Sequence, residues 1–412
     1  MERIFQEINR SPYFSIWISL LVALIALGAY GVLLSLFVGM DVFKFHHALP
    51  WTIKISTYIF FVGSCTGISM ITSLGHIFGV KRFEIIGKRA ALLALITVNV
   101  GMVSILLHLG HPERSYYFFL TPNIRSAIWG MSQFYTVAIP FIIVELWFLM
   151  RSDMARIANN STGYKQLIYS LAVLGQRDTS HESVERDHKW AMRAAVIALV
   201  FELAAFSTLG TIFGHTQAKA YWYGTYFPLF FLLTAAYSGI AWLIGIIIVT
   251  YHFQKKDMAN ELKKLIFEMA NIFAVLLSVS LLFILYKVSV GLFDPNQSGA
   301  IMLMLKGNFS LSFWAFEITL GTLIPIALIL YSLKRQWLWG LVAASVMALI
   351  GLFLTRYDFL ITGQAFPYFR YSSLDTVLPT LVESLVVGGI FGAFFLVYTL
   401  AVKFLPIDEK TH

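Results

Sequence analysis

Residues 226–252, YFPLFFLLTAAYSGIAWLIGIIIVTYH, form a 27-residue stretch without Asp, Glu, Lys or Arg. A helix rises about 1.5 Å per residue, so this stretch can cross the roughly 30 Å hydrocarbon layer of a bilayer. Including it, the chain has ten apolar stretches of sufficient length, at about 14–38, 51–78, 88–109, 126–150, 190–211, 226–252, 265–289, 308–332, 337–355 and 376–404. We therefore predict an all-α integral membrane protein with ten transmembrane helices.

The composition of the whole chain supports this fold class. Of its 412 residues, 58% are hydrophobic and only 13% are charged, which is far from soluble usage. The long spans and the 11 prolines favour helices over the alternating segments of about ten residues that build an outer-membrane barrel. A single Cys excludes a cysteine-ligated iron–sulfur cluster and an internal disulfide. Residues 1–13 carry charges of both signs and no small-residue cleavage site, which predicts a retained first helix.

The basic residues are distributed unevenly between the two sides of the predicted spans. The net charge of +8 could suggest a nucleic-acid partner, but 20 of the 30 Lys and Arg fall on the side of the two termini and 7 on the other. The positive-inside rule then makes both termini cytoplasmic, in the cytoplasmic membrane of a prokaryote. The basic excess is a topology signal, and no nucleic-acid partner is expected.

The outer connections are rich in aromatic residues, Gly, Pro and His. Examples are HPERSYYFFLTPN after residue 110 and GHTQAKAYWYGTYFP after residue 213. Aromatic residues are common at any membrane interface. The alternative is that a partner docks and a ligand enters on this face.

Ionisable residues inside the spans are the first functional candidates. A charge at the bilayer centre costs about 2.5–3.5 kcal/mol on the insertion scale, so such residues usually have a function. Long lysines can extend to the interface, but glutamates are too short to do so. The candidates are Lys54, Glu145, Glu202, Glu268, Lys287, Glu317 and Glu383.

Two helix stripes of polar and aromatic residues lead toward the outer leaflet. One lies in the second span, after His46, His47 and Pro50, and consists of Trp51, Lys54, Tyr58, Phe61 and Cys65. The other lies in the third span and consists of Thr97, Gly101, Ser104 and His108. Close packing through small residues, such as Gly63 and Gly67, is the alternative explanation.

These stripes suit a quinone better than a metal. Among the histidines inside the spans, His76 and His108 lie near opposite faces, which argues against a haem with two His ligands, and no metal motif stands out. A quinone head group needs hydrogen-bond donors, an apolar slot and a group that takes its protons. The chain has no electron carrier of its own, so a partner would have to carry the electrons.

Several strings occur in the order found in one known family. They are Phe60-Phe-Val-Gly-Ser-Cys-Thr-Gly67, Leu107-His-Leu-Gly-His-Pro-Glu-Arg114, Thr121-Pro-Asn-Ile-Arg-Ser126, Ile212-Phe-Gly214 with Trp222 and Pro228, Ser238-Gly239, and Arg356-Tyr-Asp-Phe-Leu-Ile-Thr-Gly-Gln364. Together the strings span about residues 50–365. The chain thereby resembles the polysulfide-reductase/NrfD family, and its ten spans look like the HybB, DsrP and QrcD-type branch.

The resemblance implies a layout and a set of partners. Two four-helix bundles, 51–211 and 226–355, would be flanked by an N-terminal helix and connection (1–50) and by an outer loop and C-terminal helix (356–412). A menaquinone or ubiquinone site would lie near the outer face of the first bundle, with no haem or metal in this chain. The family's usual partner is an extracytoplasmic ferredoxin-like iron–sulfur subunit, joined by a molybdopterin enzyme, a hydrogenase or a multihaem cytochrome c.

Carried over to this chain, the resemblance places His47, Trp51, His108, Gly110 and the outer half of the fifth span around the quinone. His108 stands where many relatives have Asp. Phe206 aligns with a position where many relatives have Tyr or His, and Phe cannot donate a hydrogen bond to a quinone oxygen. Either Glu202, one turn away, or a residue of another helix would replace that donor.

We predict a quinone-interacting subunit of a respiratory oxidoreductase complex, with sulfur or sulfate respiration as its setting because of the likeness to DsrP. A menaquinone head group would be surrounded by His47, Trp51, Lys54, Tyr58, Gly110, Phe206 and His108. Glu202 would take a proton and pass it toward Glu145, so that Glu202 and His108 are the catalytic candidates. The sequence leaves open whether the chain alone is an enzyme.

Three alternatives stay open at this point. A secondary transporter would use Glu202, Glu317 and Lys287 to bind a solute or couple an ion. A passive anchor of the same family would have lost its quinone site, with Phe206 as the sign of that loss. A second quinone site could lie where Lys287 and Glu317 meet.

Overall fold

The computed structural model describes residues 12–39, 43, 50–76, 80–366 and 378–407, and the part described is helical without strands. Ten helices in this part are long and apolar enough to cross a membrane, which confirms the prediction of ten spans. They are α2 (Pro12–Val38), α3 (Ile53–His76), α4 (Gly87–Leu106) preceded by η2 (Lys81–Ile86), α6 (Ala127–Asn159), α8 (His181–Gly214), α9 (Tyr226–Phe253), α10 (Asn260–Phe293), η4 (Ser312–Leu323) continuing as α12 (Ile324–Arg335), α13 (Leu338–Ala365) and α14 (Leu381–Phe404).

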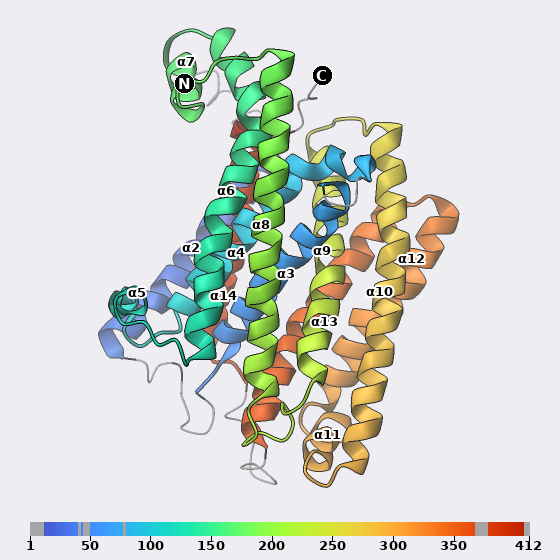
Figure 1. Cartoon of the computed structure of the whole chain (residues 1–412). Helices are drawn as coiled ribbons and strands as arrows, with labels where there is room; N and C mark the ends of the chain where they lie inside the picture. The colour runs from blue at the N-terminus through green and yellow to red at the C-terminus, as the bar shows by residue number, and fades with distance from the viewer. Residues whose placement is uncertain (1–11, 40–42, 44–49, 77–79, 367–377, 408–412) are drawn as a thin grey trace.

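In the described part of the chain, four short helices lie between the spans: η3 (Pro112–Arg114), α5 (Tyr117–Leu120), α7 (Gly163–Ala172) and α11 (Ser298–Leu305). The two ends of the molecule are distinct (Figure 1), with α7 at one end and α11 at the other. Tyr169 of α7 donates a hydrogen bond to the carbonyl of Phe404 at the end of α14 (2.8 Å), and Trp17 near the start of α2 donates to Thr399 of α14 (3.2 Å). The start of α2 and the end of α14 therefore lie together near α7. We call the two ends the α7 end and the α11 end.

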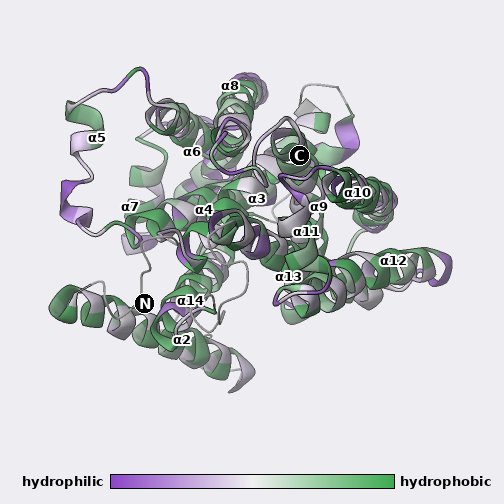
Figure 2. Cartoon of the chain, turned by 90° about the horizontal axis from the view of Figure 1, so that it is seen from below, coloured by the Kyte–Doolittle hydropathy of each residue, from purple (hydrophilic) through white to green (hydrophobic). Residues whose placement is uncertain are grey.

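The spans pack as two sets of four and a flanking pair. Helices α3, α4, α6 and α8 contact one another in a closed ring, which we call the first helix group. Helices α9, α10, η4–α12 and α13 form a second ring, the second helix group. Helices α2 and α14 pack on each other through Gly28 and Gly389, and α14 leans on α3 and α4. Figure 2 shows α2 and α12 at the periphery, with mostly hydrophobic residues, as lipid contact requires.

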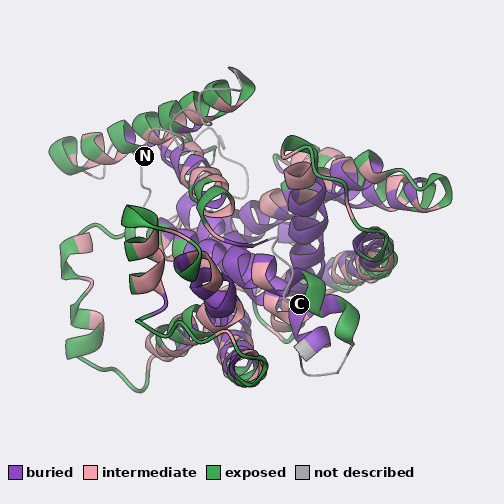
Figure 3. Ribbon diagram, turned by 90° about the horizontal axis from the view of Figure 1, so that it is seen from above, coloured by how far each residue is buried: buried purple, intermediate pink, exposed green. Residues whose placement is uncertain are grey.

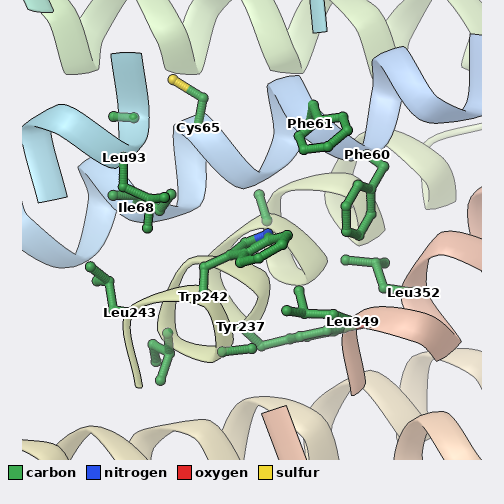
Figure 4. Close-up of a cluster of buried hydrophobic side chains, with 14 of the residues drawn as sticks. Phe60, Phe61, Cys65, Ile68, Leu93, Tyr237, Trp242, Leu243, Leu349 and Leu352 are labelled. Carbon is green, nitrogen blue, oxygen red and sulfur yellow. The ribbon is translucent and has the colours of Figure 1, made fainter. Parts of the chain in front are cut away.

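Helices α3 and α9 form the centre, where the two groups meet. In the most apolar stretch of each helix, 83% of the residues are buried in α3, against 17% in α2. Figure 3 shows buried residues gathered at the centre of the molecule and exposed residues on the outer helices. The backbones of α3 and α9 touch at two glycines, Gly67 and Gly239. A Cβ on Gly67 would lie 1.8 Å from the carbonyl oxygen of Ala235, and a Cβ on Gly239 would lie 2.2 Å from the carbonyl carbon of Gly67. Beside this crossing, Trp242 of α9 lies in a cluster with Phe60 and Phe61 of α3 (Figure 4) and donates a hydrogen bond to Ser64 (3.1 Å).

Several helices extend beyond the predicted spans. Helix α6 reaches Asn159 instead of residue 150, and α8 begins at His181 instead of residue 190, because polar turns continue these helices past the apolar stretch. The largest difference is in α13, which continues to Ala365 although residues 356–365 were expected in an outer loop. That segment is buried, and its charged and amide side chains face other helices instead of water.

Candidate functional site

A lysine and a histidine meet at the α11 end of the first helix group. The side chain of Lys54, at the start of α3, is fully buried, and its ammonium donates a hydrogen bond to the carbonyl of Leu107 (3.2 Å). Ser104 of α4 donates to the carbonyl of Lys54 (2.7 Å). The ammonium also lies 3.5 Å from the centre of the Phe43 ring, a cation–π contact. These contacts fix a positive charge between α3 and the end of α4.

His108 lies directly after α4 and is half-buried. Burial, and then the nearby Lys54 ammonium, lower the pKa of His108 to about 4. The imidazole is therefore neutral near pH 7, with one nitrogen that donates and one that accepts a hydrogen bond. We call Lys54, Ser104 and His108 the Lys54–His108 cluster. The structure brings together these members of the two predicted stripes.

Trp51 turns away from this cluster, toward the second helix group. Its indole stacks on Trp222 at 5.7 Å between ring centroids and meets the edge of Phe213. Its backbone is held by Gln364 of α13, which accepts from the Trp51 amide and donates to the Trp51 carbonyl, both at 2.9 Å. The Trp51 side chain therefore belongs to an aromatic junction between the two groups.

The other predicted pocket residues are spread over different environments. Tyr58 is buried and its hydroxyl points to the Met131 sulfur of α6 (3.6 Å). Phe206 is fully buried, stacks on Phe231 of α9 and lies so close to Gly63 that a Cβ there would be 2.6 Å from its ring. Gly110 is exposed. His47 lies outside the described residues. Phe206 thus fills the interface between α8, α3 and α9.

Glu202 lies in the interior of the first helix group. Its carboxyl group is fully buried and accepts a hydrogen bond from Ser69 of α3 through Oε1 (3.1 Å). Oε2 has no hydrogen-bond partner among the described residues. The buried Cys65 of α3 is a neighbour of the Glu202 carboxyl group. The buried carboxyl group of Glu145 of α6 is near enough to interact electrostatically with Glu202. A buried carboxyl oxygen without a partner can receive a proton or a hydrogen bond.

Two of the seven intramembrane candidates have local structural explanations. Glu268 forms an ion pair with Arg82 of η2 and is partly exposed. Glu383 forms a capping box at the start of α14. Its carboxylate accepts a hydrogen bond from the Thr380 amide, and the Thr380 hydroxyl accepts one from the Glu383 amide. Both carboxyl groups stabilise helix ends or contacts, and we assign them no functional role.

Two residues of α13 that were not among the predicted site residues make polar contacts near the centre, Arg356 within the second helix group and Gln364 with Trp51. Arg356 of α13 is 1% exposed, donates to Thr234 of α9 and lies 4.1 Å from the centre of the Phe231 ring. Gln364, two turns later, fixes Trp51 as described above. Arg356 directly follows the predicted ninth span, and Gln364 lies eight residues later in the same quoted string. Continuing the helix through that string would have placed both residues near one helix face.

The described residues include no group of three or more His, Cys, Asp and Glu side chains that could hold a metal ion. The polar groups of the first helix group are instead hydrogen-bond donors and acceptors in an apolar surround. That donor set suits an uncharged ligand with carbonyl or hydroxyl oxygens.

Comparison with known proteins places the whole chain among membrane subunits of oxidoreductases. The sequence profile described as polysulphide reductase, NrfD, matches residues 41–368. A selenate reductase subunit of Mesobacillus selenatarsenatis is 26% identical over 398 residues, which cover 93% of this chain and 92% of that one. The Hdr-like menaquinol oxidoreductase integral membrane subunit of Archaeoglobus fulgidus is 23% identical, covering 97% and 94%. A Halobacterium salinarum protein named as a dimethyl sulfoxide reductase membrane subunit is 22% identical, covering 95% and 91%.

Proposed function

Because the chain belongs to the polysulphide reductase NrfD family, we propose that it is the quinone-interacting membrane subunit of a respiratory oxidoreductase complex. It exchanges electrons between menaquinol and an extracytoplasmic iron–sulfur partner. Its relatives bear the names of reductase and oxidoreductase subunits, and one of them is named for menaquinol. The family match favours this function over secondary transport.

The observation that carries the proposal is the Lys54–His108 cluster. The buried Lys54 ammonium can donate a hydrogen bond to one oxygen of a head group, and the neutral His108 ring can donate or accept. The cluster lies at the α11 end of the first helix group, where α4 ends, and in this proposal the head group reaches it from the outer leaflet. Gly110, two residues after His108, belongs to the proposed site, and the predicted His47 lies outside the described residues.

Oxidation of a quinol supplies two electrons and two protons, and this chain's residues account only for the protons. His108 is neutral and can accept a hydrogen bond from a quinol hydroxyl at the cluster. Glu202, with one carboxyl oxygen lacking a partner among the described residues, would receive a proton deeper in the first helix group, because its partner Ser69 lies 15 residues, about 22 Å, along α3 from Lys54. Glu145 of α6 would take the proton further toward the α7 end. In this proposal the α7 end is cytoplasmic, in accordance with the charge bias of the connections.

The electrons leave at the α11 end. The connection through α5 carries exposed apolar side chains there, among them Phe119, Leu120 and Ile124. An exposed apolar patch of this kind is typical of a protein interface. We propose that the iron–sulfur subunit docks on it, with a cytochrome c or a catalytic subunit completing the complex. Sulfur or sulfate respiration stays a prediction for the terminal reaction.

The proposal is tested in the purified complex by replacing the cluster. His108→Ala and Lys54→Met should each slow quinol-dependent reduction of the partner's iron–sulfur clusters, because each removes one contact to the head group. Lys263→Met is the matched control, since it removes an exposed lysine of α10. Unchanged turnover and quinone affinity in both cluster variants would contradict the proposed site.

A further inference from the structure

A small cavity lies in the second helix group, separate from the Lys54–His108 cluster. Its volume is about 20 Å³. A water molecule needs roughly 10–15 Å³ of this kind of space, so the cavity holds about one water and is too small for a quinone head group. Its polar lining residues are Tyr221, Tyr226, Lys287, Glu317, Thr355 and Arg356, and the rest of the wall is mainly aromatic and aliphatic.

Glu317 reaches this cavity from an unusual helix. The segment η4 is π-helical over 12 residues, and the hydroxyls of Thr319 and Thr322 donate to carbonyls five residues earlier, those of Trp314 and Glu317. π-Helical turns are rare and occur often at functional sites. The Glu317 side chain is 5% exposed although its helix faces lipid on the other side.

Two polar atoms at the cavity lack partners in the described part of the chain. They are Oε2 of Glu317 and Nε of Arg356, both buried. Arg356 does donate a hydrogen bond to the Thr234 hydroxyl through its terminal nitrogen Nη2, and this bond holds the guanidinium group in place. A buried donor and a buried acceptor beside a space of this size are the usual setting of an internal water molecule.

A line of hydrogen bonds connects the cavity with the surface at the α11 end. The Lys287 ammonium donates to the carbonyl of Tyr221 (3.0 Å) and to the side chain of Gln297 (2.7 Å). Gln297 in turn donates to Asp294 (2.7 Å) in an exposed turn. Lys287 therefore contacts both the cavity and this surface network.

We propose that the cavity binds a water molecule between Glu317 and Arg356, and that Glu317 exchanges its proton with the aqueous phase at the α11 end through this water and Lys287. The Glu317 carboxyl group gives its proton to the water, and the water returns one of its own protons to the carboxyl group. The water exchanges protons in the same paired way with the Lys287 ammonium, which exchanges with the aqueous phase, so each group keeps its net charge. The second helix group thus holds a proton site of its own. The inference stands on the cavity and does not depend on quinone binding.

The groups that face Glu317 come from every element around it. They are Tyr221 before α9, Tyr226 and Tyr237 of α9, Lys287 of α10, and Arg356 and Asp358 of α13. Two cations and a second carboxyl group surround the site, so its protonation responds to all of them. A test therefore has to isolate Glu317 itself.

Infrared spectroscopy of the full-length protein in lipid nanodiscs can detect the protonated Glu317 carboxyl group by its own absorption band. The wild type should show a protonated-carboxyl band that shifts after transfer to deuterated buffer. Glu317→Gln should remove this band and Glu317→Asp should move it, whereas Glu202→Gln should leave it in place. The aspartate variant keeps the test valid if the glutamine variant does not fold.

The route is tested by the rate of that shift. Lys287→Met should slow it by roughly a hundredfold, the low end of what a positioned proton-transfer group contributes. Val288→Leu, which adds a methylene to the cavity wall, should slow it as well because the water loses its space. No band that depends on Glu317, or an exchange rate unchanged in either variant, would overturn the inference.

Discussion

Lys54→Met is the substitution that most directly separates the proposed head-group contact from simple packing. Methionine keeps an unbranched stem of similar length, so the buried slot of Lys54 stays filled, but the ammonium is lost. The carbonyl of Leu107 loses one hydrogen-bond donor at the end of α4. The stability cost of that loss should be about 1–3 kcal/mol, which thermal unfolding measures.

The effect on quinol follows from the charge of the donor. A hydrogen bond to a charged group contributes about 1.5–3 kcal/mol, and each 1.4 kcal/mol is tenfold in affinity. The apparent affinity for a soluble menaquinol analogue should therefore fall by roughly 10- to 150-fold. The assay is stopped-flow reduction of the partner's iron–sulfur clusters over a range of quinol concentrations, with Lys263→Met as control. An affinity within about twofold of the wild type would refute the assignment of Lys54 to the head group.

Three further predictions concern stability and pH. The folded-state pKa of His108, about 4, lies below its ordinary value, so stability should fall as the pH drops through the range between the two; His108→Gln should lose this dependence in thermal unfolding at about pH 5 and pH 8, and an equal slope in both proteins would contradict it. Gln364→Leu leaves the Trp51 amide and carbonyl without their partners and should lower the unfolding free energy by roughly 2–5 kcal/mol and change tryptophan fluorescence, whereas an unaltered spectrum and melting temperature would show that the junction is not held this way. Gly67→Ala should prevent folding because its methyl group would overlap Ala235, while Gly130→Ala, with no atom within 4 Å of the new Cβ, should behave as wild type in size-exclusion chromatography; equal yields of both would contradict the close crossing.

The sequence predicted the spans well because the bilayer sets a simple requirement. A run of about 20 apolar residues is visible without any tertiary information, and all ten spans are present in the described residues. The boundaries were less accurate where polar residues continue a helix. Arg356 is the clearest case, because a charge after an apolar run resembles the start of a loop until a facing helix supplies its hydrogen-bond partner, here Thr234.

The candidate site was only partly accessible from the sequence. Helical spacing placed Lys54 near the outer end of the second span, and the end of the third span supplied His108, and the structure brings these two residues together. Spacing could not show that the Trp51 ring turns toward Trp222, or that Phe206 fills a gap left by Gly63, because both depend on packing between helices far apart in the chain. Glu317 was identified as a candidate, but its cavity depends on the π-helical turns of η4.

We propose that this chain binds menaquinone at the Lys54–His108 cluster and delivers electrons to an iron–sulfur subunit. The most direct measurement is mild-detergent purification of the native protein and of Lys54→Met, followed by mass spectrometry of the subunits and extraction of quinone. We predict an iron–sulfur subunit in both preparations, with near-stoichiometric menaquinone in the wild type and much less in the variant. A lone chain without quinone, under conditions that preserve other respiratory complexes, or equal quinone in both preparations, would contradict it.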